Sequence, residues 1–156
     1  QEAIVIQMTW AGAPTIYYGD EAGVCGFTDP DNRRTYPWGE EDQGLISFYK
    51  EAICLRKENP VLTHGSTRFL TLDHHFLSYG RFSEKDQIIV AINNAKEEKE
   101  VNIPVWEAGV PRESFMERLM LTLENGFSLG DEIYHVKEGN LYLRLPPVCS
   151  MVLRRI

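Results

Sequence analysis

The sequence has few cysteines, and those it has are far apart. Cys25, Cys54 and Cys149 are odd in number and form neither a disulfide framework nor a Cys-x-x-Cys metal motif. Cysteines that are left unpaired in this way are typical of a reducing compartment. We therefore expect the protein to be cytoplasmic.

Long apolar runs are also missing. No stretch approaches the roughly 18 apolar residues of a membrane span, and the N-terminus has no basic segment followed by an apolar core. We therefore expect no membrane partner. The first residues lack an initiator Met and begin in the middle of an apolar pattern, so we expect further sequence upstream. A signal peptide could be part of that upstream sequence.

Positive charge is scarce. The chain has 16 Lys and Arg residues against 23 Asp and Glu residues, which gives a formal net charge of −7. A nucleic-acid partner requires a basic face that binds phosphates, and no basic cluster longer than a pair is visible. The loop glycines Gly19, Gly23 and Gly26 lack a phosphate-binding spacing, and we expect no cofactor.

Metal ligands in a recognisable pattern are missing as well. The segment DPDNRR begins like a calcium loop, but Arg33 and Arg34 stand where an oxygen ligand and the obligatory glycine belong. His74 and His75 are adjacent on an expected strand, which would point them to opposite faces of a sheet. We therefore predict no metal site.

The sequence does contain enough hydrophobic residues, 43%, to build a core. Its first part mixes helix and strand patterns. Residues 3–8 suit the end of a buried helix, and PTIYYG at 14–19 suits a buried strand of a parallel sheet. LISFYKEAICLRKENP at 45–60 has one apolar helical face. This order predicts an αβα unit with a long polar loop before its second helix.

Beyond residue 66 the hydrophobic period changes to two. Short candidate strands, separated by polar turns, are FLSYGRF, QIIVAIN, VNIPVW, LMLTL, NLYLRL and SMVLRRI. Six or more short strands with a turn about every dozen residues predict an antiparallel β-sandwich. We therefore predict two domains, an α/β unit in residues 1–66 and an all-β unit in residues 67–156.

The long loop before the second helix combines carboxylates, guanidinium groups and aromatic rings. On one turn, Asp29 could accept hydrogen bonds from adjacent hydroxyl groups of a sugar, and Arg33 could donate to them. The alternative is structural, because from residue types alone Asp29 more often caps a turn and Arg33 more often forms an ion pair. Tyr18, Tyr36 and Trp38 could stack on sugar rings, or they could belong to the core.

This loop and its flanks resemble a known family. The pattern G-x-P-x-I-Y-Y-G-D-E at residues 12–21 resembles the eighth barrel strand of the α-amylase family, glycoside hydrolase family 13. The segments DPDNRR and YPW resemble the following loop in the neopullulanase, maltogenic amylase and cyclomaltodextrinase group, and residues 45–62 resemble the last barrel helix. The resemblance implies the last β/α unit of a (β/α)8 TIM barrel, followed by the family's C-terminal antiparallel β-sandwich.

The resemblance also implies where the catalytic groups lie. Members of this retaining family hold a nucleophilic aspartate, a glutamate acid/base and a second aspartate on earlier barrel strands, and this sequence shows none of those motifs. Asp20 and Glu21, adjacent in an expected extended segment, would point to opposite faces and make a poor catalytic pair. We predict no catalytic residue in this chain. The resemblance assigns Asp29 and Arg33 to the glucose on the non-reducing side of the cleaved bond.

Two functions are compatible with these patterns. The first is the C-terminal part of a glycoside hydrolase acting on α-glucan oligosaccharides, which is inactive alone and has the missing N-terminal barrel portion as its partner. The second is a standalone carbohydrate-binding or protein-interaction module built on the β-sandwich. A lone barrel strand at residues 14–19 would leave two unpaired edges, which favours self-association of the chain.

Overall fold

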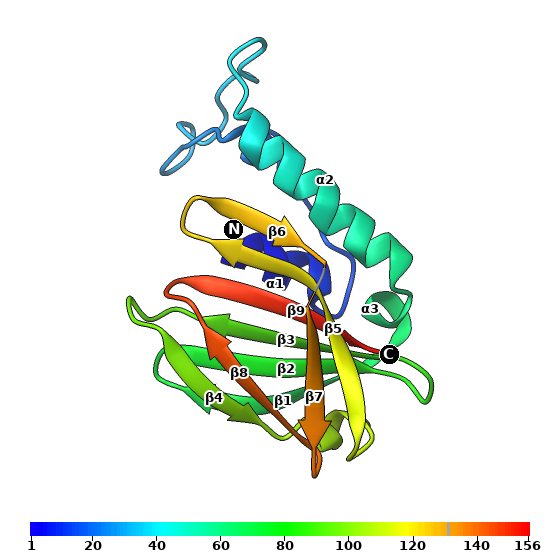
Figure 1. Ribbon diagram of the computed structural model, residues 1–156. Helices are drawn as coiled ribbons and strands as arrows, with labels where there is room; N and C mark the ends of the chain where they lie inside the picture. The colour runs from blue at the N-terminus through cyan, green and yellow to red at the C-terminus, as the bar shows by residue number, and fades with distance from the viewer. Residues whose placement is uncertain (131) are drawn as a thin grey trace.

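The computed structural model describes residues 1–130 and 132–156, which form three α-helices, two short 3-10 helices and nine strands (Figure 1). The helices are α1 (Glu2–Thr9), η1 (Asp20–Ala22), α2 (Gln43–Glu58), α3 (Val61–His64) and η2 (Val105–Ala108). The strands are β1 (Ser66–Asp73), β2 (Phe76–Phe82), β3 (Gln87–Asn93), β4 (Lys99–Ile103), β5 (Ser114–Leu123), β6 (Gly126–Leu129), β7 (Ile133–Lys137), β8 (Asn140–Leu145) and β9 (Cys149–Arg155). No helix in the described ranges is long and apolar enough to cross a membrane.

All nine described strands belong to one antiparallel sheet that folds over on itself. The strand order is β1-β2-β3-β9-β5-β7-β8-β4, and β6 is attached to β5. β5 joins the two layers, because its residues 116–121 pair with β9 whereas its residues 114–117 pair with β7. Its register shifts between Arg118 and Met120, a bulge that bends the strand from one layer to the other. The predicted antiparallel arrangement is confirmed, but its two layers are continuous through β5.

One core lies between the two layers. β4, β8 and β7 lie in front of β1, β2 and β3 in Figure 1. In β8, Leu141, Leu143 and Leu145 are buried whereas Tyr142 and Arg144 between them are exposed, as expected for a strand with one face on a core. The buried residues of this core are Phe76, Ile89, Ala91, Ile103, Val105, Ala108, Val110, Met116, Leu121, Val136, Leu141, Leu143, Leu145, Cys149, Met151 and Leu153.

A second core lies on the other face of β2, β3 and β9, where the helices pack. Every residue of β3 is buried, which means that this strand is covered on both faces. The buried residues of the second core are Ile4, Val5, Met8, Phe48, Tyr49, Ala52, Leu55, Val61, Leu62, Tyr79, Ile88, Val90, Ile92, Met120 and Val152. α1, α2 and α3 therefore form a third layer on the sheet.

The position of α2 follows from its cap and its one apolar face. Asp42 caps the N-terminus by accepting a hydrogen bond from the Leu45 N–H at 2.9 Å. Phe48 and Leu55, which are two turns apart on one side of the helix, are buried against the sheet. The helix predicted for residues 45–60 is confirmed as α2, and the shorter N-terminal helix is confirmed as α1.

A buried arginine ties the helices to the sheet. Arg81 in β2 has no solvent exposure. Its guanidinium donates hydrogen bonds to the carbonyl oxygens of Thr9 at 2.6 Å, Leu62 at 2.8 Å and Gly65 at 2.9 Å. Thr9 ends α1, and its hydroxyl lies 2.5 Å from the Tyr79 hydroxyl. These contacts join α1, α3 and the residue that precedes β1 to a single side chain on β2.

Two predictions about strands are wrong. PTIYYG at 14–19 forms no strand, although its residues favour β-structure, because no described strand lies beside it to pair with its backbone. VNIPVW does not continue as a strand beyond Ile103, because Pro104 cannot donate to the ladder and η2 follows it. The sequence patterns also miss β1, β6 and β7.

The burial of the three thiols predicts their reactivity. Cys149 has no solvent exposure, and burial raises the pKa of its thiol to about 11. Cys25 and Cys54 are exposed, but a hydrogen bond to Glu58 raises the pKa of the Cys54 thiol. We expect titration with a thiol reagent to modify Cys25 first and Cys54 more slowly, and to modify Cys149 only after denaturant is added. Rapid modification of Cys149 in the native chain would contradict its position in the core.

Candidate functional site

The long loop between α1 and α2 is held at its base by hydrogen bonds. The Gly19 N–H donates to the Glu21 carboxylate at 2.9 Å, and the Asp42 N–H donates to the Ala22 carbonyl at 3.1 Å. Ala22 is buried, so this segment anchors the loop beside the start of α2. Asp20 and Glu21 lie in η1 and not in an extended segment, which corrects the prediction that they point to opposite faces of a strand.

The tip of the loop is a compact turn. The Asp31 N–H donates to the Thr28 carbonyl at 2.8 Å, and the Asp31 carboxylate accepts a hydrogen bond from the Phe27 N–H at 3.0 Å. A Cβ atom on Gly26 would lie 2.6 Å from Asn32 Cα, closer than two non-bonded carbon atoms can approach. The two limbs of the turn are therefore in direct backbone contact, which requires glycine at position 26.

Two ion pairs lie on this turn. Arg33 contacts the Asp29 carboxylate twice, from Nε to Oδ1 at 2.7 Å and from Nη2 to Oδ2 at 3.1 Å. Arg34 contacts Asp31 Oδ1 through Nε at 3.1 Å and through Nη2 at 2.6 Å. All four side chains are between 46% and 67% exposed, so water screens the pairs and they contribute little to the stability of the fold.

The two pairs differ in what else they contact. The Asp31 carboxylate also accepts a backbone N–H of the turn, and the Tyr18 hydroxyl donates to the Arg34 carbonyl at 3.0 Å. The Arg34 guanidinium and then that backbone N–H lower the pKa of Asp31. Asp31 and Arg34 therefore hold the turn together. Within the described ranges, the side chains of Asp29 and Arg33 form hydrogen bonds with each other alone.

Aromatic rings lie in two pairs on the same loop. The ring centroids of Tyr17 and Tyr18 are 4.9 Å apart, and those of Tyr36 and Trp38 are 4.5 Å apart. Tyr18 is 48% exposed and Trp38 is 82% exposed, so these two rings do not belong to the core, whereas Tyr36 is partly buried. Phe27 is 89% exposed and was not among the site residues predicted from the sequence. Its position as a large apolar residue inside a polar turn is the sequence feature that could have identified it.

The structure brings the predicted site residues together only in part. Asp29 and Arg33 are in contact, and the Tyr18 hydroxyl donates a hydrogen bond to the backbone carbonyl of Arg34. Tyr36 and Trp38 contact each other, but no hydrogen bond or ring contact found among the described residues joins them to the ion pair. The loop thus offers a charged fork for adjacent hydroxyl groups and, at separate points, exposed rings for stacking.

Two adjacent histidines lie in the turn between β1 and β2. The ring centroids of His74 and His75 are 4.6 Å apart. The prediction that they lie on a strand and point to opposite faces is therefore wrong. Across residues 1–130 and 132–156, no group of three or more His, Cys, Asp or Glu side chains is placed to hold a metal ion.

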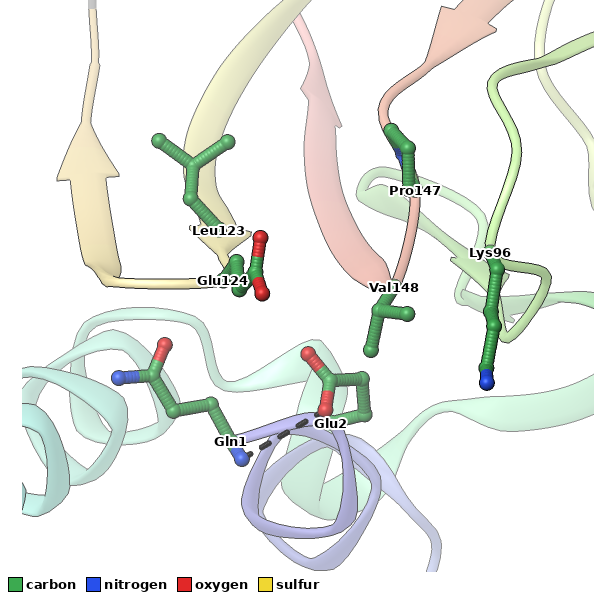
Figure 2. A pocket seen from close by; sticks show the side chains of 7 residues that line it. All are labelled: Gln1, Glu2, Lys96, Leu123, Glu124, Pro147 and Val148. Atoms are coloured by element: carbon green, nitrogen blue, oxygen red, sulfur yellow. Dashed lines mark ion pairs between the residues drawn. The ribbon is translucent and has the colours of Figure 1, made fainter.

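A cavity of about 550 Å³ lies away from this loop, at the start of α1. Figure 2 shows its lining, which comes from the chain start and the first residue of α1, the end of β5 and the turn after it, and the segments that precede β4 and β9. Glu2, Glu124 and Lys96 give it charges of both signs, and the amine of Gln1 lies 3.6 Å from Glu2 Oε2. None of its described lining residues is aromatic, so it offers no ring on which a sugar could stack.

Sequence comparison finds relatives over nearly the whole chain. The chain is 37% identical over 155 residues to Neopullulanase 2 from Thermoactinomyces vulgaris, a match that covers 97% of this chain and 24% of that protein. It is 41% identical over 167 residues to an amylopullulanase from Thermoanaerobacterium thermosulfurigenes, a match that covers 97% of this chain and 8% of that protein. The chain thus spans about a quarter or less of these relatives. No protein-family model matches it.

Solved structures share the fold. An α-amylase from Geobacillus thermoleovorans, in complex with acarbose, superposes with a TM-score of 0.83 at 25% identity, over 99% of this chain and 32% of the amylase chain. A cyclomaltodextrinase superposes with a TM-score of 0.75 at 27% identity, over 97% of this chain and 25% of its own. In both comparisons this chain matches less than a third of a larger protein.

Proposed function

We propose that this chain, which is homologous over nearly its whole length to enzymes of the α-amylase family, acts as the C-terminal part of a glycosidase that hydrolyses α-glucans. In this enzyme Asp29 and Arg33 hold a glucose unit next to the cleaved bond. The catalytic carboxylates belong to barrel strands that lie outside this chain.

The observation that carries this proposal is the free hydrogen-bonding capacity of the Asp29–Arg33 pair. Asp31 and Arg34 hold the turn, so Asp29 and Arg33 are not needed to shape it. A guanidinium has five N–H donors and a carboxylate has about four acceptor positions, and the mutual contacts use only part of each. Adjacent hydroxyl groups of a glucose unit can accept from Arg33 and donate to Asp29.

The helical layer also supports an enzyme over a standalone β-sandwich module. The face of β2, β3 and β9 that turns away from β7 and β8 is apolar and covered by α1, α2 and α3. The loop of residues 10–42 is not part of a β-sandwich. A barrel enzyme carries such a loop at the C-terminal end of a strand, where active-site loops lie. In the whole enzyme, residues 14–19 would pair with neighbouring barrel strands and become the eighth.

The proposal predicts that the chain alone releases no reducing sugar from pullulan or maltooligosaccharides. A chimera in which this chain replaces the aligned segment of Neopullulanase 2 from Thermoactinomyces vulgaris is expected to release it, because the catalytic strands are then present. Both proteins are assayed for reducing sugar against a buffer blank. Turnover by the chain alone that Asp29→Asn abolishes would overturn the proposal. A chimera that folds like its parent and is inactive would also overturn it.

A further inference from the structure

The outer face of the front layer carries a row of exposed side chains that is separate from the loop. Phe115 in β5 lies directly opposite His135 in β7, and Asn102 in β4 lies directly opposite Tyr142 in β8. Phe115 is 49% exposed and Tyr142 is 69% exposed. These side chains alternate with buried ones along their strands and therefore point away from the core. Exposed rings that gather on one face of a sheet make that face a candidate interaction site.

A pocket lies within this row, over the hairpin of β7 and β8. It has a volume of about 440 Å³ and is lined by Glu113, His135, Lys137, Glu138, Asn140 and Tyr142. β7 and β8 pair only at the two residue pairs nearest their turn and then diverge (Figure 1). This divergence leaves room between the rings of His135 and Tyr142, which a regular ladder would hold side by side.

The rings of this pocket are held in place by their neighbours. His135 is stacked on Phe115, with ring centroids 4.9 Å apart and an interplanar angle of 19°. His135 Nε2 lies 3.4 Å from Glu113 Oε2. The Tyr142 hydroxyl accepts a hydrogen bond from Asn102 Nδ2 at 3.3 Å. Rings that are fixed before a ligand arrives lose little conformational entropy when it binds.

We propose that this pocket is a second oligosaccharide-binding site, in which a pyranose ring packs against Tyr142 and His135. A pyranose has an apolar C–H face that packs on an aromatic ring and a rim of hydroxyl groups that require polar partners. Lys137 provides donors for these hydroxyl groups, and the Glu113 carboxylate provides acceptors. The ligand class, an α-glucan chain, rests on the proposed function. This site binds a glucan chain on the surface of the enzyme, whereas the chain is cleaved in the barrel.

The test is a titration of the isotope-labelled chain with maltoheptaose to about 10 mM, followed by amide chemical shifts. We expect the shifts to change in β7 and β8. Tyr142→Ala is expected to weaken binding by about tenfold or more, because the stacking surface is lost, whereas Tyr142→Phe keeps the ring and most of the affinity. Trp38→Ala, which removes an exposed ring from the loop, is the matched control and is expected to leave these shifts unchanged.

Three results would overturn this proposal. The first is the absence of any change in β7 and β8 at the highest concentration. The second is binding that Trp38→Ala abolishes and Tyr142→Ala does not, since the sugar would then occupy the loop. The third is a dimer in sedimentation that Tyr142→Ala converts to a monomer, since the face would then join two copies of the chain. The chemical-shift changes of the unmodified chain locate the binding site even if a variant fails to fold. The activity of the neopullulanase chimera tests the proposed function independently of this titration.

Discussion

Replacing Arg81 by Met is expected to destabilise the protein by about 3–5 kcal/mol. Met has a similar length but donates no hydrogen bond, so the carbonyl oxygens of Thr9, Leu62 and Gly65 lose their common donor. Each buried acceptor that is left without a partner costs roughly 1–3 kcal/mol, although relaxation recovers part of the sum. Because these carbonyls belong to α1, α3 and Gly65, the residue between α3 and β1, the helical layer should loosen first.

Urea or thermal denaturation measures this loss, and for a chain of this size it corresponds to a drop in Tm of roughly 6–20 °C. The matched control is Arg68→Met on the neighbouring strand β1. Arg68 is 55% exposed and paired with Glu107 on the surface, so we expect its loss to cost less than about 1 kcal/mol. Arg81→Lys is expected to be intermediate, because a single ammonium group cannot reach carbonyls on several sides. Equal effects of Arg81→Met and Arg68→Met would show that the buried contacts do not hold the helices.

Sequence patterns correctly predict the helices and strands whose form is determined by their own residues. α2 carries a cap and one apolar face, and β2, β3 and β8 are short runs of strand-forming residues between turns. β1 is partly exposed and shows no regular alternation, and β6 has only four residues, so neither pattern stands out. Residues 14–19 have the composition of a strand, but a strand also needs a neighbour, which composition does not supply.

The two candidate sugar sites also differ in how far the local sequence predicts them. Asp29 and Arg33 are four positions apart in one polar turn, so local sequence is enough to predict their contact, and the structure places them together. Phe115, His135 and Tyr142 are distant along the chain and gather only through the register of β5, β7 and β8. A slip of one residue in that register would turn a ring toward the core. The pocket on the sheet is therefore visible only in the structure.

Asp29→Ala or Arg33→Ala is expected to lower kcat/KM of the neopullulanase chimera about ten- to a hundredfold on long maltooligosaccharides. The loss of a charge-assisted hydrogen bond in the partly buried subsite that we expect in the whole enzyme costs about 1.5–3 kcal/mol, which corresponds to this factor. Binding energy at a sugar next to the cleaved bond also positions the reacting one, so kcat falls along with affinity. Residual activity is expected to remain measurable, because in the proposed function neither residue makes or breaks a bond.

Short substrates separate this role from a structural one. A maltoside too small to fill the subsite never contacts the pair, so Asp29→Ala should cost it little while costing a long oligosaccharide the full factor. Arg34→Ala is the matched control, because Arg34 belongs to the neighbouring ion pair on the same turn and contacts Asp31. Because the Arg34 side chain contacts Asp31 and no sugar in the proposed site, we expect Arg34→Ala to cost the long substrate less than Asp29→Ala does and to cost the short substrate little. Equal losses on short and long substrates for Asp29→Ala, with the fold intact, would show that Asp29 and Arg33 shape the turn and do not hold a sugar.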